Sequence, residues 1–289
     1  MSISGQNLSI VIVTLKSEKI IHECIKTIDH NIPIIVVENS NNYKFKEDLE
    51  FKYKNLKCVV TEKNLGMGTA NNIGIKLANT DYVYILNPDV QLEKNTLENL
   101  FLASKKIPNF SIISPIHSDH KFPNWKKNIK KDFDNSQPFE VETVDGFSML
   151  LNKNKFINNI YFDENFFLYL ENNDLCIRIK REGGSIYIVP TAKINHEGSK
   201  TVDTKYKEEV ELSRNWHWIW SKFYFNKKHF GFFKAIKVCV STYFTSLLKF
   251  SFYLIIKNSF KKKIYFNRAS GFYNALLGRA SWYRPNLKD

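Results

Sequence analysis

The chain has 289 residues, of which 43% are hydrophobic and 25% are charged. This composition excludes an intrinsically disordered chain and fits one large domain, alone or with an appendage. The formal net charge of +13 is concentrated at one end, because residues 212–289 carry 15 Lys and Arg and one acid, whereas residues 1–211 carry 27 basic and 28 acidic residues. The tail also holds half of the aromatic residues. We therefore expect a neutral body followed by a basic, aromatic tail.

The four cysteines lie far apart in the sequence, and no CxxC spacing occurs. This pattern predicts neither a zinc site nor a disulfide framework, and it favours reduced thiols in a cytosolic protein. The first residues, MSISGQNLSIVIVTLKS, have no positively charged leader and no cleavage site. We therefore expect no signal peptide.

Continuous apolar, β-branched runs in the first part of the chain predict strands that are buried on both faces. Apolar residues at helical spacing predict helices between them. In chain order, the sequence predicts strands at 8–14, 32–40, 56–62 and 81–90, and helices at 17–29, within 64–80 and at 92–106. This alternation predicts an α/β fold with a Rossmann-like, mostly parallel sheet flanked by helices.

Ligands bind to sheets of this kind beyond the carboxyl ends of the strands. Polar residues stand at four such ends, namely Thr14, residues 38–40, residues 63–64 and residues 87–89. We therefore expect a ligand site at this edge of the sheet.

The second half of the body has a less regular pattern. Residues 111–138 are rich in Lys, Asn and Pro, which predicts an irregular connection or a variable lobe. Apolar alternation over residues 141–156 predicts one further strand, and a basic amphipathic helix is expected from Glu171. The stretch SIYIVPTAKINHEGS then predicts a short strand that runs into a polar loop at His196.

Two segments near the strand ends have both a structural and a functional interpretation. In LNPDV, Asp89 follows a strand and a proline, which is typical of a turn. A carboxylate at a strand end also holds Mg²⁺ or Mn²⁺, which in turn binds a diphosphate. NLGMGTANNIG matches no standard phosphate-loop pattern. It is either a flexible loop or a helix N-terminus approached by phosphate or ribose.

The stretch YLENNDLC places two carboxylates, Glu171 and Asp174, at the predicted start of a helix. Interaction with the helix dipole, worth roughly 0.3–1 kcal/mol each, explains them without any function. Because they are three residues apart, they would share a helix face, and one could accept a proton while the other orients the acceptor hydroxyl. His196 is likewise either a structural histidine or a metal ligand.

The order of these motifs is specific as a set. VVENS, KNLGMGTANNIGI, DYVYILNPDV, FDENFFLYLENNDLC and VPTAKINHEGS follow one another along the chain. Residues 7–200 thereby resemble the family-2 glycosyltransferases of GT-A fold, in particular the rhamnosyltransferase-like group that builds bacterial surface polysaccharides. The resemblance implies a GT-A domain at residues 1–211, with a donor half at about 1–110 and an acceptor half at about 139–211. It also implies inverting transfer of a sugar, with rhamnose the first candidate, from a nucleotide-diphosphate donor to a hydroxyl of a saccharide acceptor.

The same resemblance assigns site residues. Asp89 matches the NPD form of the metal-binding DxD element, and His196 matches a histidine that joins the metal, Mg²⁺ or Mn²⁺, in some members. Seven residues are implied to contact the nucleotide-sugar: Thr14, Glu38, Asn39, Asn64, Gly66, Asn71 and Asn87. Glu38 stands where the family usually has Asp, a departure that is expected to shift contacts with the base.

The expected position of the catalytic base is occupied by an amide. LENNDLC matches the family pattern EDxDLC, in which the second acid is often credited with the base, and this residue is Asn172 here. An amide cannot take a proton from a hydroxyl at neutral pH. Either Glu171 or Asp174 is therefore the base, or the chain is an inactive nucleotide-sugar-binding subunit of another transferase. A nucleotidyltransferase is a third alternative, disfavoured because no basic Gly-rich triphosphate loop is present.

The tail, residues 212–289, is expected to be helical. Its run 238–256 is near the length that spans a bilayer, but Lys249 inside it would cost about 2.5–3.5 kcal/mol. A helix lying in the membrane interface fits better, with lysines 261–263 facing anionic lipid. A basic helical subdomain packed on the sheet is the alternative, and nucleic acid is disfavoured because no nucleic-acid module is recognised.

The resemblance adds a setting to this tail. It implies a cytoplasmic enzyme, peripheral on the inner face of the cell membrane, and an acceptor carried on a polyprenyl diphosphate. The sequence leaves the oligomeric state open.

Overall fold

The computed structural model describes residues 7–119, 123–126, 136–196 and 202–287. The strands are β1 (Leu8–Thr14), β2 (Ile34–Glu38), β3 (Leu56–Val60), β4 (Tyr82–Leu86), β5 (Val90–Leu92), β6 (Ile112–His117), β7 (Trp125–Lys126), β8 (Phe139–Glu140), β9 (Thr143–Val144), β10 (Ser148–Asn152) and β11 (Ile186–His196). The α-helices are α1 (Ile21–Lys26), α2 (Tyr43–Lys52), α3 (Met67–Leu77), α4 (Thr96–Lys106), α5 (Glu171–Arg181), α6 (Lys207–Phe230), α7 (Phe232–Ile255) and α8 (Ser259–Leu276). Short 3₁₀ turns lie at Lys153–Lys155, Ile157–Asn159 and Thr204–Tyr206.

The chain forms two compact units. The first, called the sheet unit, comprises Met1–Leu65, Thr69–Asp163 and Asn172–Val202. The second, called the helical unit, comprises Gly66–Gly68, Glu164–Glu171 and Asp203–Asp289. The division expected after residue 211 falls inside α6, and the domain boundaries stay a prediction.

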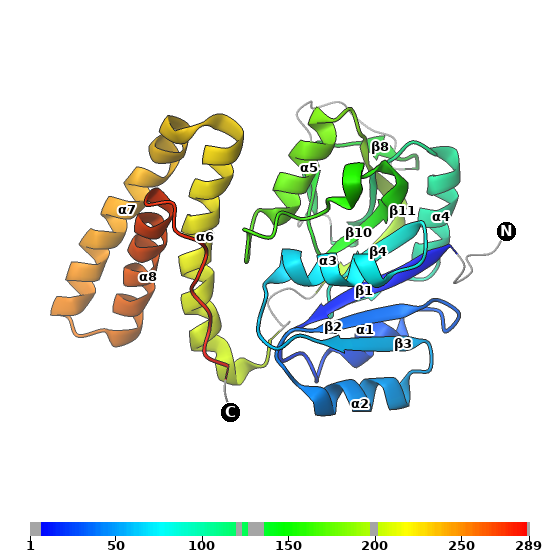
Figure 1. Ribbon diagram of the computed structural model, residues 1–289, viewed down its shortest axis with the longest axis horizontal. Coiled ribbons are helices and arrows are strands. Elements are labelled where there is room, and N and C mark those ends of the chain that lie inside the picture. The colour runs from blue at the N-terminus through cyan, green and yellow to red at the C-terminus, as the bar shows by residue number, and fades with distance from the viewer. Residues whose placement is uncertain (1–6, 120–122, 127–135, 197–201, 288–289) are drawn as a thin grey trace. The chain divides into compact units, whose positions relative to one another are not determined.

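The sheet unit is built on one mixed sheet, in the order β3-β2-β1-β4-β10-β6-β11-β5, with β8 paired to β11 (Figure 1). The first four of these strands run parallel, and the register pairs Thr14 with Glu38 and Glu38 with Val60. Their carboxyl ends therefore lie side by side. β10 is inserted antiparallel between β4 and β6. The predicted α/β fold class is confirmed.

Three local expectations differ from the structure. Residues 111–138 were expected to be irregular, but β6 is a buried strand beside β10, because Pro115 obscures a strand pattern that its neighbours support. The strand expected at 81–90 ends at Leu86, and Val90 begins β5, which pairs with β11 at one edge of the sheet. His196 is the last residue of β11 rather than part of a loop. Pairing between strands that are distant in the sequence determines all three of these features, and a local sequence pattern does not reveal such pairing.

Helices cover both faces of the sheet (Figure 1). On one face, side chains of α1, α2 and α4 form a core with the sheet, and on the other face α3 and α5 do so. The contact between α3 and β1 is close, because a Cβ on Gly74 would lie 2.3 Å from a methyl group of Val11. The predicted buried, apolar strands follow from this double coverage.

The helical unit has a core of its own between α6, α7 and α8. Buried residues of this core include Trp216, Phe223, Cys239 and Phe272. A Cβ on Gly271 of α8 would lie 2.3 Å from the carbonyl oxygen of Trp216, so the two helices touch along their backbones. In the part of the chain that the structure describes, α7 is the one helix long and apolar enough to cross a membrane by length and composition, and 11% of its most apolar window is buried.

Candidate functional site

The ends of β1 and β2 place a buried carboxylate beside a buried hydroxyl. Thr14 Oγ1 donates to Glu38 Oε2 over 2.5 Å, and the Ser40 backbone N–H donates to Glu38 Oε1 over 2.8 Å. The Ser40 hydroxyl donates to Oε1 as well. Glu38 has no exposed surface, and desolvation raises its carboxyl pKa despite these hydrogen bonds. Its side chain thus folds back onto its own strand end, and its contact with a nucleotide stays a prediction.

Asn39 organises the next part of this edge. Its Oδ1 accepts from the Thr61 hydroxyl and from the Leu65 backbone N–H, both over 2.9 Å. Its Nδ2 donates to Asn64 Oδ1 over 3.0 Å. The predicted residues Thr14, Glu38, Asn39 and Asn64 are therefore brought together by the adjacent ends of β1, β2 and β3.

The turn after β4 carries the predicted metal ligand. The Asp89 side chain is 2% exposed, and its Oδ1 lies 3.4 Å from Nε2 of His196. The ring of Phe147 stacks on that imidazole at 4.2 Å between centroids. Asn87 leads into the turn through its backbone, since its N–H donates to the Phe147 carbonyl over 2.9 Å. The residues 89 and 196, distant in the sequence, are thus adjacent in the sheet unit.

The donor set of this pair suits a hard divalent cation. Within the described residues no group of three or more His, Cys, Asp and Glu side chains is placed to hold a metal. Mg²⁺ usually takes one or two carboxylates from the protein and completes its coordination with phosphate oxygens and water. A carboxylate and an imidazole nitrogen 3.4 Å apart fit that manner of binding and also suit Mn²⁺.

Asp145 is a candidate site residue that the sequence reasoning missed. Desolvation raises its carboxyl pKa although the residue keeps an exposed surface, and Lys126 and His196 act on it in the opposite direction. Asp145 therefore lies within electrostatic reach of the Asp89–His196 pair. The signal in the sequence is the Asp-Gly dipeptide shortly before β10.

The residues predicted for the glycine-rich loop lie at the start of α3, and they belong to different units. Gly66 belongs to the helical unit, has φ +86°, and would place a Cβ 2.4 Å from the Phe167 carbonyl oxygen, so only glycine fits. Asn71 belongs to the sheet unit and is buried, and its Oδ1 has no hydrogen-bond partner among the described residues. Its neighbour Asn72 is structural, because its amide exchanges two hydrogen bonds with the backbone of Phe162.

Two of the polar residues in the first turns of α5 have structural partners. Asp174 is fully buried, and its Oδ2 accepts from Nε of Arg178, one turn further, over 2.9 Å. Asn172 Nδ2 donates to the carbonyl oxygen of Val144 over 2.8 Å. Both side chains therefore serve the local fold, and Asp174 already has a cationic partner.

Glu171, the first residue of α5, differs from both. Its Oε2 is buried, and no hydrogen-bond partner for it occurs among the residues that the structure describes. Desolvation raises its carboxyl pKa from 4.5 to about 7. A carboxylate with one buried, unpartnered oxygen and a pKa near neutrality has the properties of a general base.

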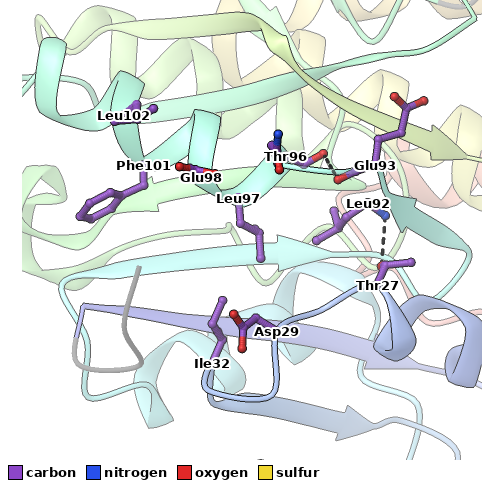
Figure 2. A pocket seen from close by; sticks show the side chains of 11 residues that line it. Thr27, Asp29, Ile32, Leu92, Glu93, Thr96, Leu97, Glu98, Phe101 and Leu102 are labelled. Atoms are coloured by element: carbon purple, nitrogen blue, oxygen red, sulfur yellow. Dashed lines mark hydrogen bonds between the residues drawn. The ribbon is translucent and has the colours of Figure 1, made fainter. Parts of the chain in front are cut away.

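A cavity among the described residues lies elsewhere in the sheet unit. It has a volume of about 380 Å³, and side chains of α4 such as Leu97 and Phe101 face Asp29 and Ile32 across it (Figure 2). Thr27 on its wall is already occupied, because its hydroxyl accepts from the Leu92 backbone N–H over 3.1 Å. None of the predicted site residues lines this cavity.

Comparison with known proteins assigns the chain to a family. The sequence model described as glycosyl transferase family 2 matches residues 9–172. This match contains every predicted site residue except Asp174 and His196.

Two curated relatives are similar at low identity. The low-salt glycan biosynthesis hexosyltransferase Agl10 of Haloferax volcanii is 25% identical over 235 residues, which cover 72% of this chain and 69% of that protein. The N-acetylglucosaminyl-diphospho-decaprenol L-rhamnosyltransferase of Mycobacterium tuberculosis is 24% identical over 203 residues, which cover 57% of this chain and 66% of that protein.

A solved structure supports the fold. The crystal structure of GalNAc-T7 with UDP, GalNAc and Mn²⁺ superimposes with a TM-score of 0.55 at 17% identity and covers 73% of this chain. The matched part spans 51% of the GalNAc-T7 chain. The likeness is one of fold, the GT-A fold that the motif order implied.

Proposed function

The chain belongs to glycosyl transferase family 2, and from this premise we propose that it moves a sugar from a nucleotide-diphosphate donor to a hydroxyl of a saccharide acceptor, with inversion, in surface polysaccharide biosynthesis. The observation that carries the proposal is the Asp89–His196 pair at the carboxyl end of the parallel strands. Rhamnose is the proposed sugar and a polyprenyl-diphosphate-linked saccharide the proposed acceptor. The name of the mycobacterial relative supports both.

The sheet unit is proposed to bind the donor. Asp89 and His196 would hold a divalent cation, Mg²⁺ or Mn²⁺. When bound, that cation supplies positive charge against the diphosphate leaving group. The side chains proposed to contact nucleotide and sugar are Thr14, Glu38, Asn39, Asn64, Asn71 and Asn87, with the Gly66 backbone. Asn71 supports this role best, because a buried amide oxygen without a partner is costly unless a ligand donates to it.

Glu171 is proposed as the base that takes the proton of the acceptor hydroxyl as this oxygen attacks the anomeric carbon. The proposal rests on its unpartnered, buried Oε2 and on its pKa of about 7. Asp174 is the less suitable of the two candidate bases, because its carboxylate is paired with Arg178. We therefore assign it to positioning of α5.

Asn172 keeps one alternative open, an inactive donor-binding subunit of another transferase. An amide at this position supports that alternative, whereas the adjacent Glu171, whose buried Oε2 has no hydrogen-bond partner among the described residues, supports an active enzyme. Incubation with nucleotide-sugars and Mn²⁺ separates the two. Slow, metal-dependent release of nucleotide indicates an enzyme, whereas thermal stabilisation by a donor without any release indicates a binding subunit.

The helical unit is proposed to bind the anionic inner face of the cytoplasmic membrane. On α7, Phe233, Leu248 and Ile255 are 86%, 74% and 78% exposed. Lysines at 261–263, near the start of α8, add positive charge. A helix that combines exposed apolar residues with nearby lysines has the chemistry of an interfacial segment.

Vesicle flotation tests this association. We expect the protein to float with vesicles that contain phosphatidylglycerol and less with phosphatidylcholine alone. Leu248→Glu should reduce flotation, whereas Leu102→Glu, which alters an exposed leucine of α4, should not. If the wild type and both variants remain in the unbound fraction to the same extent, the membrane role is rejected.

A further inference from the structure

The chain enters α5 through a strained turn. Tyr169 and Leu170 have φ of +72° and +68°, and neither is glycine. Two successive residues in the left-handed region cost free energy and persist only where the surroundings hold them. They directly precede Glu171, the first residue of α5, so their backbone conformation sets the position of Glu171 at the start of the helix. Both belong to the segment Glu164–Glu171 of the helical unit, called the base loop below.

Helix α6 holds the second half of the base loop. The Ser221 hydroxyl donates to the carbonyl oxygen of Leu168 over 2.7 Å, and Ser221 is fully buried. The rings of Tyr169 and Trp218 meet edge to face at 5.4 Å. These contacts fix one backbone group and one side chain beside the strained pair.

Residues near the C-terminus hold the first half of the base loop. The Ser281 hydroxyl donates to the carbonyl oxygen of Asn165 over 2.8 Å. The guanidinium of Arg284 lies 3.8 Å from the ring centroid of Phe167, and His217 of α6 packs against the same ring at 4.4 Å. Phe167 is thus held between the C-terminal segment and α6.

A buried histidine joins these two supports. His217 Nε2 donates to the carbonyl oxygen of Tyr283 over 2.8 Å. Desolvation lowers the imidazole pKa to about 3, so the ring is neutral at physiological pH and can carry its proton on Nε2. The segment 281–284 therefore cannot move from α6 without breaking a buried hydrogen bond.

We propose that Ser221 and Arg284 are positioning residues that hold the base loop in its strained conformation and thereby place Glu171. The C-terminal region is then part of the catalytic apparatus in addition to its proposed membrane role. This inference rests on the proposed function, because it takes Glu171 to be the base.

Ser221→Ala removes the hydrogen bond to the loop and leaves α6 otherwise unchanged. We expect kcat to fall by about ten- to a hundredfold, since small displacements of a reacting group have effects of this size. Donor binding should stay unchanged. A relaxed loop admits water to Glu171, so the acidic limb of the pH–rate profile should move to lower pH. Ser246→Ala is the matched control, because this buried hydroxyl donates to the carbonyl oxygen of Thr242 in its own helix.

Arg284→Met tests the other support. It removes the charge over Phe167 and keeps an apolar side chain of similar length, so the same two changes are expected. Arg279→Met is its control, because Arg279 lies in the same region and donates to Asn274 instead. The ionisable side chains that act on Tyr169 from α6, Arg214 and Glu211, stay in place in every variant.

The outcomes are distinct. The inference is supported if either test variant, but neither control, shows a lower kcat and an acidic limb at lower pH. It is overturned if both test variants keep the kcat and the pH–rate profile of the wild type. If Ser221→Ala fails to fold, Arg284→Met decides alone. If the wild type transfers no sugar, the proposed function fails. The ¹³C resonance of the Glu171 carboxyl, identified by its loss in Glu171→Gln, then still reports whether the variants lower its pKa.

Discussion

Replacing Glu171 by glutamine tests the proposed base through stability as well as turnover. Glutamine has the shape of glutamate but does not ionise. The Glu171 carboxyl has a buried Oε2 without a partner among the described residues, and desolvation raises its pKa from 4.5 to about 7. We expect Glu171→Gln to abolish turnover and, at alkaline pH, to raise the free energy of unfolding.

The sign follows from the direction of the pKa shift. Because the pKa is higher in the folded state, the native protein keeps its proton between pH 4.5 and about 7, where the unfolded chain has lost it. The stabilisation present below pH 4.5 is therefore lost as pH rises through about 7. At about 1.4 kcal/mol per pKa unit, the whole shift is worth about 3.5 kcal/mol, of which about 2.5 kcal/mol falls between pH 5 and pH 8.

Urea unfolding followed by circular dichroism, at about pH 5 and about pH 8, measures this difference. From pH 5 to pH 8, the free energy of unfolding of the wild type should fall by about 2.5 kcal/mol more than that of Glu171→Gln. Glu164→Gln, which alters an exposed carboxylate of the same loop, should follow the wild type. If the wild type and Glu171→Gln show the same pH dependence, Glu171 is not held as a desolvated carboxylate and the reasoning for the base fails.

Three further outcomes are expected. Asp89→Asn should abolish turnover and the Mn²⁺-dependent rise in melting temperature with nucleotide-sugar, and full activity in this variant would reject Asp89 as the metal ligand. Asp174→Asn should leave measurable turnover but lower the free energy of unfolding by about 3 kcal/mol, because Arg178 loses its buried partner; complete inactivity in a folded variant would instead favour Asp174 as the base. Gly271→Ala should lower the melting temperature by several degrees, because its Cβ would lie 2.3 Å from the Trp216 carbonyl oxygen, and an unchanged melting curve would contradict this backbone contact.

The ends of the parallel strands could be predicted from local pattern. Apolar runs that are buried on both faces stop abruptly at polar residues, and this contrast located Thr14, Asn39 and Asp89 near one edge of a sheet. The pattern did not contain the partner of each strand. For this reason it missed β6 and placed His196 in a loop, where β11 in fact brings it to 3.4 Å from Asp89.

The sequence by itself determined the fold class, the family and the set of polar residues at the strand ends, because buried strands and the order of the motifs can be recognised from local sequence patterns. Only the tertiary structure distinguished Glu171 from Asp174. Both are acids at the start of one helix. They differ in their partners, because Arg178 pairs with the Asp174 carboxylate, whereas Oε2 of Glu171 is buried without a hydrogen-bond partner among the described residues. The sequence also divided body from tail by charge. Burial and long-range hydrogen bonds, which no local pattern encodes, joined the base loop to the C-terminal helices.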